Sequence, residues 1–137
     1  MRCRSSLSFF AFLWSGFVCL GLLLSKTGGG DATLTLKADG SIFASGTSIT
    51  STSGKLHTIF WSDADNNSDG YIRLNGASTT ITSNGGDIVL GGGLDDGSNS
   101  GTALDGRPDG YARAPATGTT TGVYLQLANL NSGTGSI

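Results

Sequence analysis

One short phrase occurs three times in the chain and limits the folds that the chain can adopt. Its copies are Ile49–Leu56, Ile81–Ile88 and Leu130–Ile137. Each copy reads aliphatic residue, Thr or Asn, Ser, two variable residues, Gly, any residue, aliphatic residue. The glycines of the phrase are Gly54, Gly86 and Gly135. A constant gap between two inward-facing aliphatic residues, bridged by a small polar turn, is what the stacked coils of a β-solenoid require.

The composition favours a body of strands and turns with almost no helix. Charged residues make up 13%, 23 of the 137 residues are glycine, and all ten acidic residues are Asp. Glu supports helices, whereas Asp competes for backbone amides and favours turns. The net charge is −2 and no basic patch is present, which argues against a nucleic-acid partner. Both cysteines, Cys3 and Cys19, precede this body, which therefore has no thiolate metal site.

Short alternating segments follow Lys26. They are Thr33–Leu36, Leu56–Trp61, Tyr71–Leu74, Asp87–Leu90 and Val123–Leu127. This alternation predicts strands with one buried face. The predicted inward residues are Leu34, Leu36, Ile42, Ile49, Leu56, Ile72, Leu74, Ile81, Ile88, Leu90, Leu125, Leu127, Leu130 and Ile137. The prediction is an all-β solenoid over residues 26–137, with a β-sandwich as the alternative.

The spacing of the phrase is uneven. It recurs after 32 residues and then after 49. The longer interval contains Gly91–Gly101 and Asp105–Tyr111, which are rich in Gly and Asp. Such clusters form ladders poorly and predict a loop inserted into one coil at about residues 91–118. Loops are where a scaffold of this kind usually carries its binding chemistry, although this one could equally be decoration.

Residues 1–25 predict a signal peptide or a membrane anchor. Arg2 and Arg4 precede an apolar run over residues 7–24, which predicts an N-terminal hydrophobic helix. A basic start before an apolar run is the layout of a secretory signal, and 18 residues are also just enough to span a membrane. No clear Ala-x-Ala cleavage site follows. A cleaved signal, an uncleaved anchor and an accidental extension of the reading frame therefore stay open.

One segment predicts a calcium loop. Its candidate ligands are Asp63, Asp65, Asn67, Asp69 and Tyr71. From Asp65 the chain matches D-x-N-x-D-G-x-I, the first eight positions of such a loop. Position 12, which normally supplies a bidentate carboxylate, is Gly76, so Asp63 would have to substitute for it. The alternative is a solvated turn in which Asp and Asn side chains bind backbone amides.

No catalytic residue is predicted. His57 is the only histidine and is expected on the outer face of a strand, without the nucleophile and the orienting acid that a general base needs. Four aromatic residues lie near predicted turns, namely Trp61, Tyr71, Tyr111 and Tyr124. Exposed aromatics could stack on sugars, or instead pack on one another or beneath a loop.

The order of these motifs resembles a known family. The motifs are Phe60–Ile72, Ile81–Gly93, Gly110–Ala112, Gly122–Leu125 and Leu130–Ile137. Together they resemble the repeat region of filamentous haemagglutinin-type bacterial exoproteins and related large surface adhesins, over roughly residues 31–137. The resemblance implies a right-handed parallel β-helix, secretion through an outer-membrane partner, a secreted or cell-surface location, and adhesion to glycans or proteins of a host or neighbouring cell. Because the chain stops at Ile137 with no polar cap, a fragment of a longer protein is expected.

Two classes of function follow from these patterns. The first is a non-enzymatic structural or adhesive surface module involved in adhesion or biofilm. The alternative is a calcium-assisted β-helix that binds or cleaves polysaccharide. A lyase needs several acids and a basic residue on one face, and the dense cluster is formed by Asp63, Asp65, Asp69 and Arg73.

Overall fold

The computed structural model describes residues 11–14, 17–98, 101, 104–113 and 122–137. These residues form twelve strands and no helix, so the prediction of an all-β chain is confirmed for this part. The strands are β1 Ala11–Trp14, β2 Phe17–Leu20, β3 Leu23–Lys26, β4 Ala32–Lys37, β5 Ile42–Ser45, β6 Ser48–Ser51, β7 Leu56–Ser62, β8 Ile72–Asn75, β9 Thr80–Thr82, β10 Ile88–Gly92, β11 Val123–Gln126 and β12 Asn129–Asn131.

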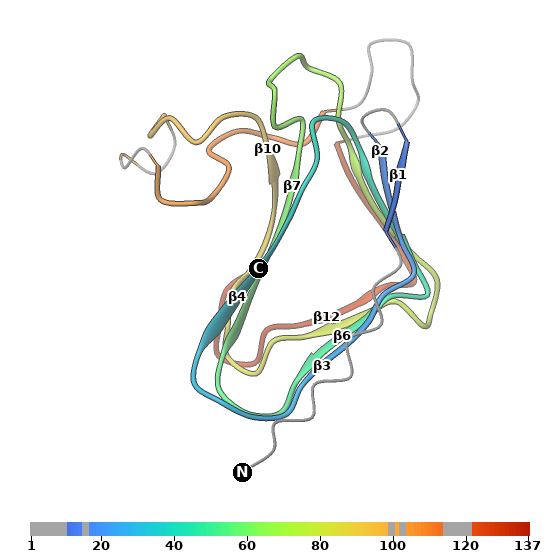
Figure 1. The fold of residues 1–137 in the computed structure, drawn as a ribbon, viewed down its shortest axis with the longest axis vertical. Coiled ribbons are helices and arrows are strands. Elements are labelled where there is room, and N and C mark those ends of the chain that lie inside the picture. Colours follow the sequence, from blue (N-terminus) through green and yellow to red (C-terminus); the bar gives the residue numbers. More distant parts are fainter. Residues whose placement is uncertain (1–10, 15–16, 99–100, 102–103, 114–121) are drawn as a thin grey trace.

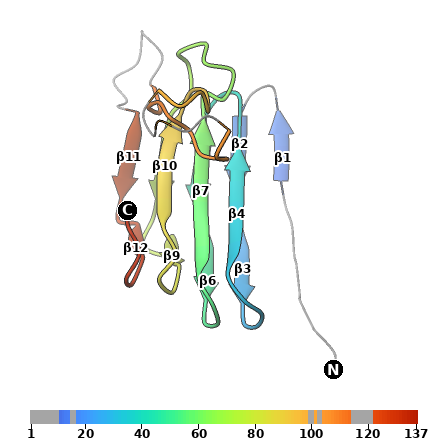
Figure 2. The same cartoon turned by 90° about the vertical axis from the view of Figure 1, so that its left-hand side faces the viewer.

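The strands pair in three sheets. The first sheet has the order β1-β2-β5-β8-β11, the second β3-β6-β9-β12 and the third β4-β7-β10. Every pairing is parallel except that of β1 with β2. The chain visits the three sheets in turn, and we call each such circuit a coil. Figure 1 shows the sheets as three sides of a triangle, and Figure 2 shows β4, β7 and β10 side by side.

The repeated phrase stacks on itself in register. Ile49 pairs with Ile81, and Ile81 pairs with Leu130, which confirms the alignment of the three copies. Leu24 pairs with Ile49 in the same way, so β3 begins a further copy that the sequence pattern did not reveal. This copy is one residue longer and carries Lys26 at the position of the serine.

The inward aliphatic residues form one core between the sheets. Ile42, Ile49, Ile72, Leu74, Ile81, Ile88 and Leu56 are buried, and Leu34, Leu36, Leu90 and Leu130 pack against them. Burying a Leu or Ile side chain stabilises a fold by roughly 1.5–3 kcal/mol. The predicted inward orientation is confirmed for these residues, and stacking of the coils is what covers them.

Three predicted inward residues are exposed instead. Leu125, Leu127 and Ile137 have 48%, 76% and 67% of their surface accessible. They belong to the last coil, and within the described residues no strand pairs with the outer edge of β11 or β12. Leu127 also leaves the strand conformation, with φ of 60°. The prediction is wrong here because the sequence pattern gives the phase of a strand but not whether another coil covers it.

The predicted N-terminal hydrophobic helix over residues 7–24 is not found in the described part of that segment. Ala11–Trp14, Phe17–Leu20 and Leu23–Lys26 are strands. Leu20 and Leu22 are buried in the core, whereas Leu23 is 71% exposed. A continuous apolar run has no clear period, so the pattern could not separate a buried strand from a helix.

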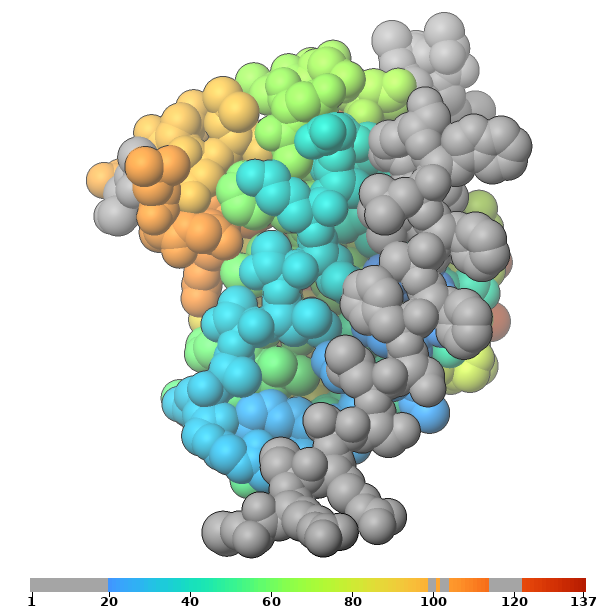
Figure 3. Space-filling view, in the orientation of Figure 1, coloured from blue at the N-terminus to red at the C-terminus, as the bar shows by residue number. Residues whose placement is uncertain are grey.

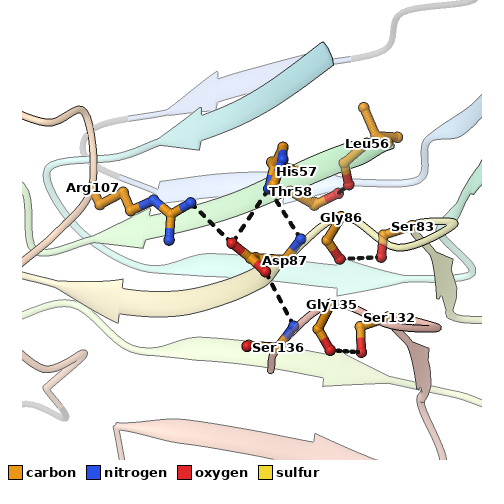
Figure 4. Close-up of polar contacts among 10 residues, drawn as sticks. All are labelled: Leu56, His57, Thr58, Ser83, Gly86, Asp87, Arg107, Ser132, Gly135 and Ser136. Atoms are coloured by element: carbon orange, nitrogen blue, oxygen red, sulfur yellow. Dashed lines mark hydrogen bonds and ion pairs between the residues drawn. The ribbon is translucent and has the colours of Figure 1, made fainter. Parts of the chain in front are cut away.

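The polar part of the phrase forms the corner between the second and third sheets, which we call the serine corner. In each copy the serine hydroxyl donates to the glycine carbonyl three residues later: Ser51 to Gly54 at 2.9 Å, Ser83 to Gly86 at 2.5 Å and Ser132 to Gly135 at 2.8 Å. Figure 4 shows the second and third of these bonds one above the other. The three serines are buried, and the bond satisfies a hydroxyl and a carbonyl that the turn removes from water.

The glycines of the serine corner leave no room for a side chain. A Cβ atom on Gly54 would lie 2.7 Å from the Gly30 carbonyl oxygen of the preceding coil. On Gly86 it would overlap the Leu56 carbonyl and lie 2.7 Å from the His57 nitrogen. Stacked coils therefore approach each other most closely at this corner, and the close approach selects glycine.

Replacing Gly86 by alanine is expected to lower the free energy of unfolding by about 2 kcal/mol or more, because the added methyl group must displace backbone. Gly86 does not adopt a positive φ, so the effect is steric. Gly28→Ala is the matched control, since a Cβ there meets nothing within 4 Å. Urea unfolding followed by far-ultraviolet circular dichroism measures both variants. Equal stability of the two would contradict the close stacking of the coils.

Candidate functional site

Two loops lie together at the corner between the third and first sheets. Residues 63–71 connect β7 to β8 and are here called the Asp63 loop. Residues 93–98, 101 and 104–113, which are described parts of the connection from β10 to β11, are called the insertion. Figure 1 shows both at the top of the triangle, beyond the ends of β7 and β10. Every loop residue that the sequence singled out for metal binding lies at this corner.

Asp63 organises the loop that carries its name. Its side chain is fully buried, and its Oδ1 accepts hydrogen bonds from the backbone N–H groups of Ser68 at 3.0 Å and Asp69 at 3.3 Å. Asp65 accepts a hydrogen bond from the side chain of Asn67 at 2.8 Å, and Asn67 accepts one from the N–H of Asp69 at 2.9 Å. These side-chain oxygens accept hydrogen bonds from within their own loop, as the solvated-turn alternative to a calcium site predicts.

The predicted calcium ligands all lie in the Asp63 loop. In the described part of the chain no three His, Cys or Asp side chains are placed so that they could hold a metal ion. The Tyr71 carbonyl accepts the N–H of Ile42 at 2.8 Å within the sheet. Of the candidate ligand atoms in the described part of the chain, Asp63 Oδ2 is buried and has no hydrogen-bond partner. Calcium binding stays a prediction, and calorimetric titration with calcium tests it.

Aspartates also give the insertion its shape. Asp109 is 6% exposed, and its Oδ2 accepts the N–H groups of Asp96 at 2.8 Å and Gly97 at 2.5 Å. Asp95 accepts two more, at 3.1 and 2.9 Å, from residues 105–106. Because short carboxylates bind backbone amides in turns, the Asp-rich composition of this segment produces a defined loop.

The insertion is bound to the Asp63 loop and to β7. Gly70 and Arg113 exchange backbone hydrogen bonds of 2.9 and 2.6 Å. The Arg113 guanidinium also donates to the Ser68 hydroxyl at 3.1 Å. The buried Trp61 indole donates to the Gly93 carbonyl at 2.7 Å. Segments that are some 45 residues apart in the chain, such as Ser68 and Arg113, therefore form one surface.

Asp87 connects the insertion to three coils (Figure 4). Its carboxylate accepts hydrogen bonds from the Arg107 guanidinium and from the Ser136 N–H, both at 3.1 Å. His57 Nδ1 accepts the Asp87 N–H at 3.1 Å and lies 3.4 Å from the carboxylate. The second contact becomes an ion pair only when Nδ1 carries a proton. The Ser136 hydrogen bond, followed by that of Arg107, holds the pKa of Asp87 below its usual value, although partial burial opposes the shift.

The sequence missed the importance of Asp87. It occupies the variable position of the second phrase, beside the essential glycine, and nothing in the pattern separated it from the other aspartates. Among the described residues no hydroxyl or thiol is hydrogen-bonded to His57. The hydrogen bond from Arg107 to Asp87 fixes the position of the insertion on the third sheet.

A cavity of about 200 Å³ lies between the Asp63 loop and the insertion. The residues that line it include Asn66, Leu94, Asp96, Ser98, Tyr111 and Arg113. Figure 3 shows the two loops, green and orange, side by side at the upper edge of the molecule. The sequence singled out Tyr111 as an aromatic near a turn, but the residues around it come from two loops whose contact no local pattern indicates.

Phe43, Tyr124 and Trp61 lie against basic side chains. The Arg73 guanidinium lies 5.4 Å from the ring centre of Phe43 and 5.3 Å from that of Tyr124. The three residues pair across β5, β8 and β11. Trp61 is buried, with the Lys37 ammonium 3.8 Å from its ring centre. Tyr111 is 75% exposed, so its surface remains open to a ligand.

No protein-family model, curated protein or solved structure matches this chain. Within the described residues there is also no helix of the length and apolarity that crossing a membrane requires. The function is therefore inferred from the geometry of the chain itself.

The lowered pKa of Asp87 predicts an acid-dependent loss of stability. A carboxylate whose pKa is lower in the folded state stabilises the fold above its unfolded pKa of about 3.9, and this contribution disappears as the pH falls through the folded value. Asp87→Asn should therefore be less stable than wild type near neutral pH, with the gap closing below about pH 4. Urea midpoints across this range measure the gap, with exposed Asp39→Asn as control. A gap that does not change with pH would contradict the assignment.

Proposed function

We propose that the chain is a segment of a right-handed parallel β-helix that serves as a non-enzymatic, adhesive module of a bacterial secreted or surface-exposed repeat protein. The parallel pairing in three sheets and the in-register stacking of the phrase support this fold. The right hand is proposed because parallel crossovers strongly favour that hand. The resemblance to filamentous haemagglutinin-type exoproteins points to the same class.

The observation that carries the proposal is the placement of the loops. Two corners of each coil are closed by short turns, whereas the Asp63 loop and the insertion both project from the third corner. Hydrogen bonds from Gly70 to Arg113 and from Arg107 to Asp87 fix the insertion to its scaffold. A rigid scaffold that presents ordered polar loops on one side is suited to recognising a surface rather than enclosing a substrate.

The partners that we propose are glycans or proteins on a host or neighbouring cell. Export through an outer-membrane secretion partner is part of the same proposal. A net charge of −2 supports a partner other than nucleic acid, since nucleic-acid binding relies on basic surfaces.

The polysaccharide lyase is the less well supported alternative. It needs Arg73 beside the acidic residues of the Asp63 loop, whereas the guanidinium of Arg73 contacts Phe43, Tyr124 and Gln126. The amphipathic side chain of Arg73 therefore contributes to the outer packing of the first sheet. We accordingly propose no enzymatic activity.

Bead adhesion tests the proposed function. Beads coated with the folded protein should be retained on epithelial or bacterial cell layers several-fold more than beads coated with albumin, and excess soluble protein should compete. Heat-unfolded protein on the same beads controls for nonspecific stickiness. Retention no greater than that of albumin on every layer would contradict the proposal. Release of unsaturated uronate from acidic polysaccharides would contradict it in favour of a lyase.

A further inference from the structure

We propose that the cavity between the Asp63 loop and the insertion binds one neutral pyranose ring, such as the terminal sugar of a cell-surface glycan. Tyr111 is the stacking platform of this site. The inference rests on the proposed adhesive function and names the ligand class that the module recognises.

The size of the cavity fits a single sugar. Its volume of about 200 Å³ is below the 300–1,000 Å³ of sites for drug-sized ligands. It lies between loops that project beyond the strands at an outer corner of the coils (Figure 1), and it is open to solvent. A terminal ring of a glycan can enter such a site while the remainder of the glycan stays outside.

Tyr111 supplies the apolar part of the recognition. Its side chain is 75% exposed, and within the described residues its hydroxyl has no hydrogen-bond partner. An aromatic ring offers a large flat surface that loses little conformational freedom when it is covered. The C–H face of a pyranose ring is flat and weakly apolar, so it can cover this surface while its hydroxyl groups stay free for polar contacts.

The polar side chains around Tyr111 match those hydroxyl groups. The Asn66 side-chain amide makes no hydrogen bond among the described residues. Asp96 uses Oδ1 to accept the Ser98 N–H at 2.9 Å and keeps Oδ2 available. Arg113 uses one nitrogen for Ser68 and keeps further N–H donors. Because each sugar hydroxyl both donates and accepts, neighbouring donors and acceptors of this kind can bind a vicinal pair.

The charges favour a neutral sugar over an acidic one. Asp96 and Arg113 line the same cavity with opposite charges, so the site has no net charge to attract an anion. For the carboxylate of a uronate or sialate, repulsion by Asp96 offsets attraction by Arg113. A neutral hexose is not subject to this repulsion.

The walls of the cavity are held in place before any ligand arrives. The Asp109 carboxylate fixes the amides of Asp96 and Gly97, and Trp61 fixes the Gly93 carbonyl. Binding therefore requires little ordering of the protein, which favours affinity for a small ligand.

A titration of ¹⁵N-labelled protein with the methyl glycosides of glucose, galactose, mannose and N-acetylglucosamine tests the site. At least one should cause saturable shifts at the amides of Gly93, Gly110 and Tyr111. Tyr111→Ala should weaken binding about tenfold, and Asp96→Asn should also weaken it. Leu104→Ala is the matched control, because Leu104 belongs to the insertion, is 85% exposed and does not line the cavity.

Two results would overturn the proposal. One is the absence of saturable shifts with all four neutral glycosides. The other is binding of glucuronate or N-acetylneuraminate alone, strengthened by Asp96→Asn, which defines an anion site. Sugar binding without bead adhesion would leave this site standing and refute the adhesive function. Bead adhesion without sugar binding would support the adhesive function and refute the sugar site.

Discussion

The serine corner is the interaction on which the rest of the structure depends. At this corner a buried hydroxyl of one residue donates to the carbonyl of a glycine three residues later, as Ser83 does to Gly86. The glycine then lies directly on the backbone of the preceding coil. The hydroxyl satisfies a carbonyl of the turn that is removed from water, and the missing side chain lets the coils approach each other closely. The two features together fix where the aliphatic residues on either side enter the core.

The coils stack closely at two corners, and the longer loops lie at the third corner. The corner between the first and second sheets is also satisfied internally, since buried Thr79 donates to the Asn75 carbonyl at 2.5 Å and accepts the N–H of Gly46 at 3.0 Å. Longer segments are therefore accommodated between the third and first sheets. There Asp109 and Asp95 bind backbone amides and turn a Gly-rich segment into an ordered wall beside Tyr111. The Asp-rich composition thus links the fold to the proposed sugar site.

The sequence predicted the features that recur in every coil and missed the features that occur in one coil only. The phrase predicted which aliphatics face inward, and Ile49 and Ile81 pair as it indicated. It could not predict that Leu127 is exposed, because that depends on whether a further coil covers it. Residues 17–26 have no readable period, so their strands went unrecognised. The role of Asp87 also went unrecognised, because its partners Arg107 and Ser136 are 20 and 49 residues away in the chain.

Nuclear Overhauser contacts across the phrase test the central claim most directly. A stack of parallel coils places Ile49 beside Ile81 and Ile81 beside Leu130. Long-range contacts between residues 32 and 49 positions apart in the sequence are therefore predicted. Antiparallel strands bring α-carbons of facing residues to about 4.5 Å at non-hydrogen-bonded pairs and give strong contacts between α-protons. Parallel-type contacts between these three residues would support the account. Antiparallel contacts between the strands of the body, as in a β-sandwich, would contradict it.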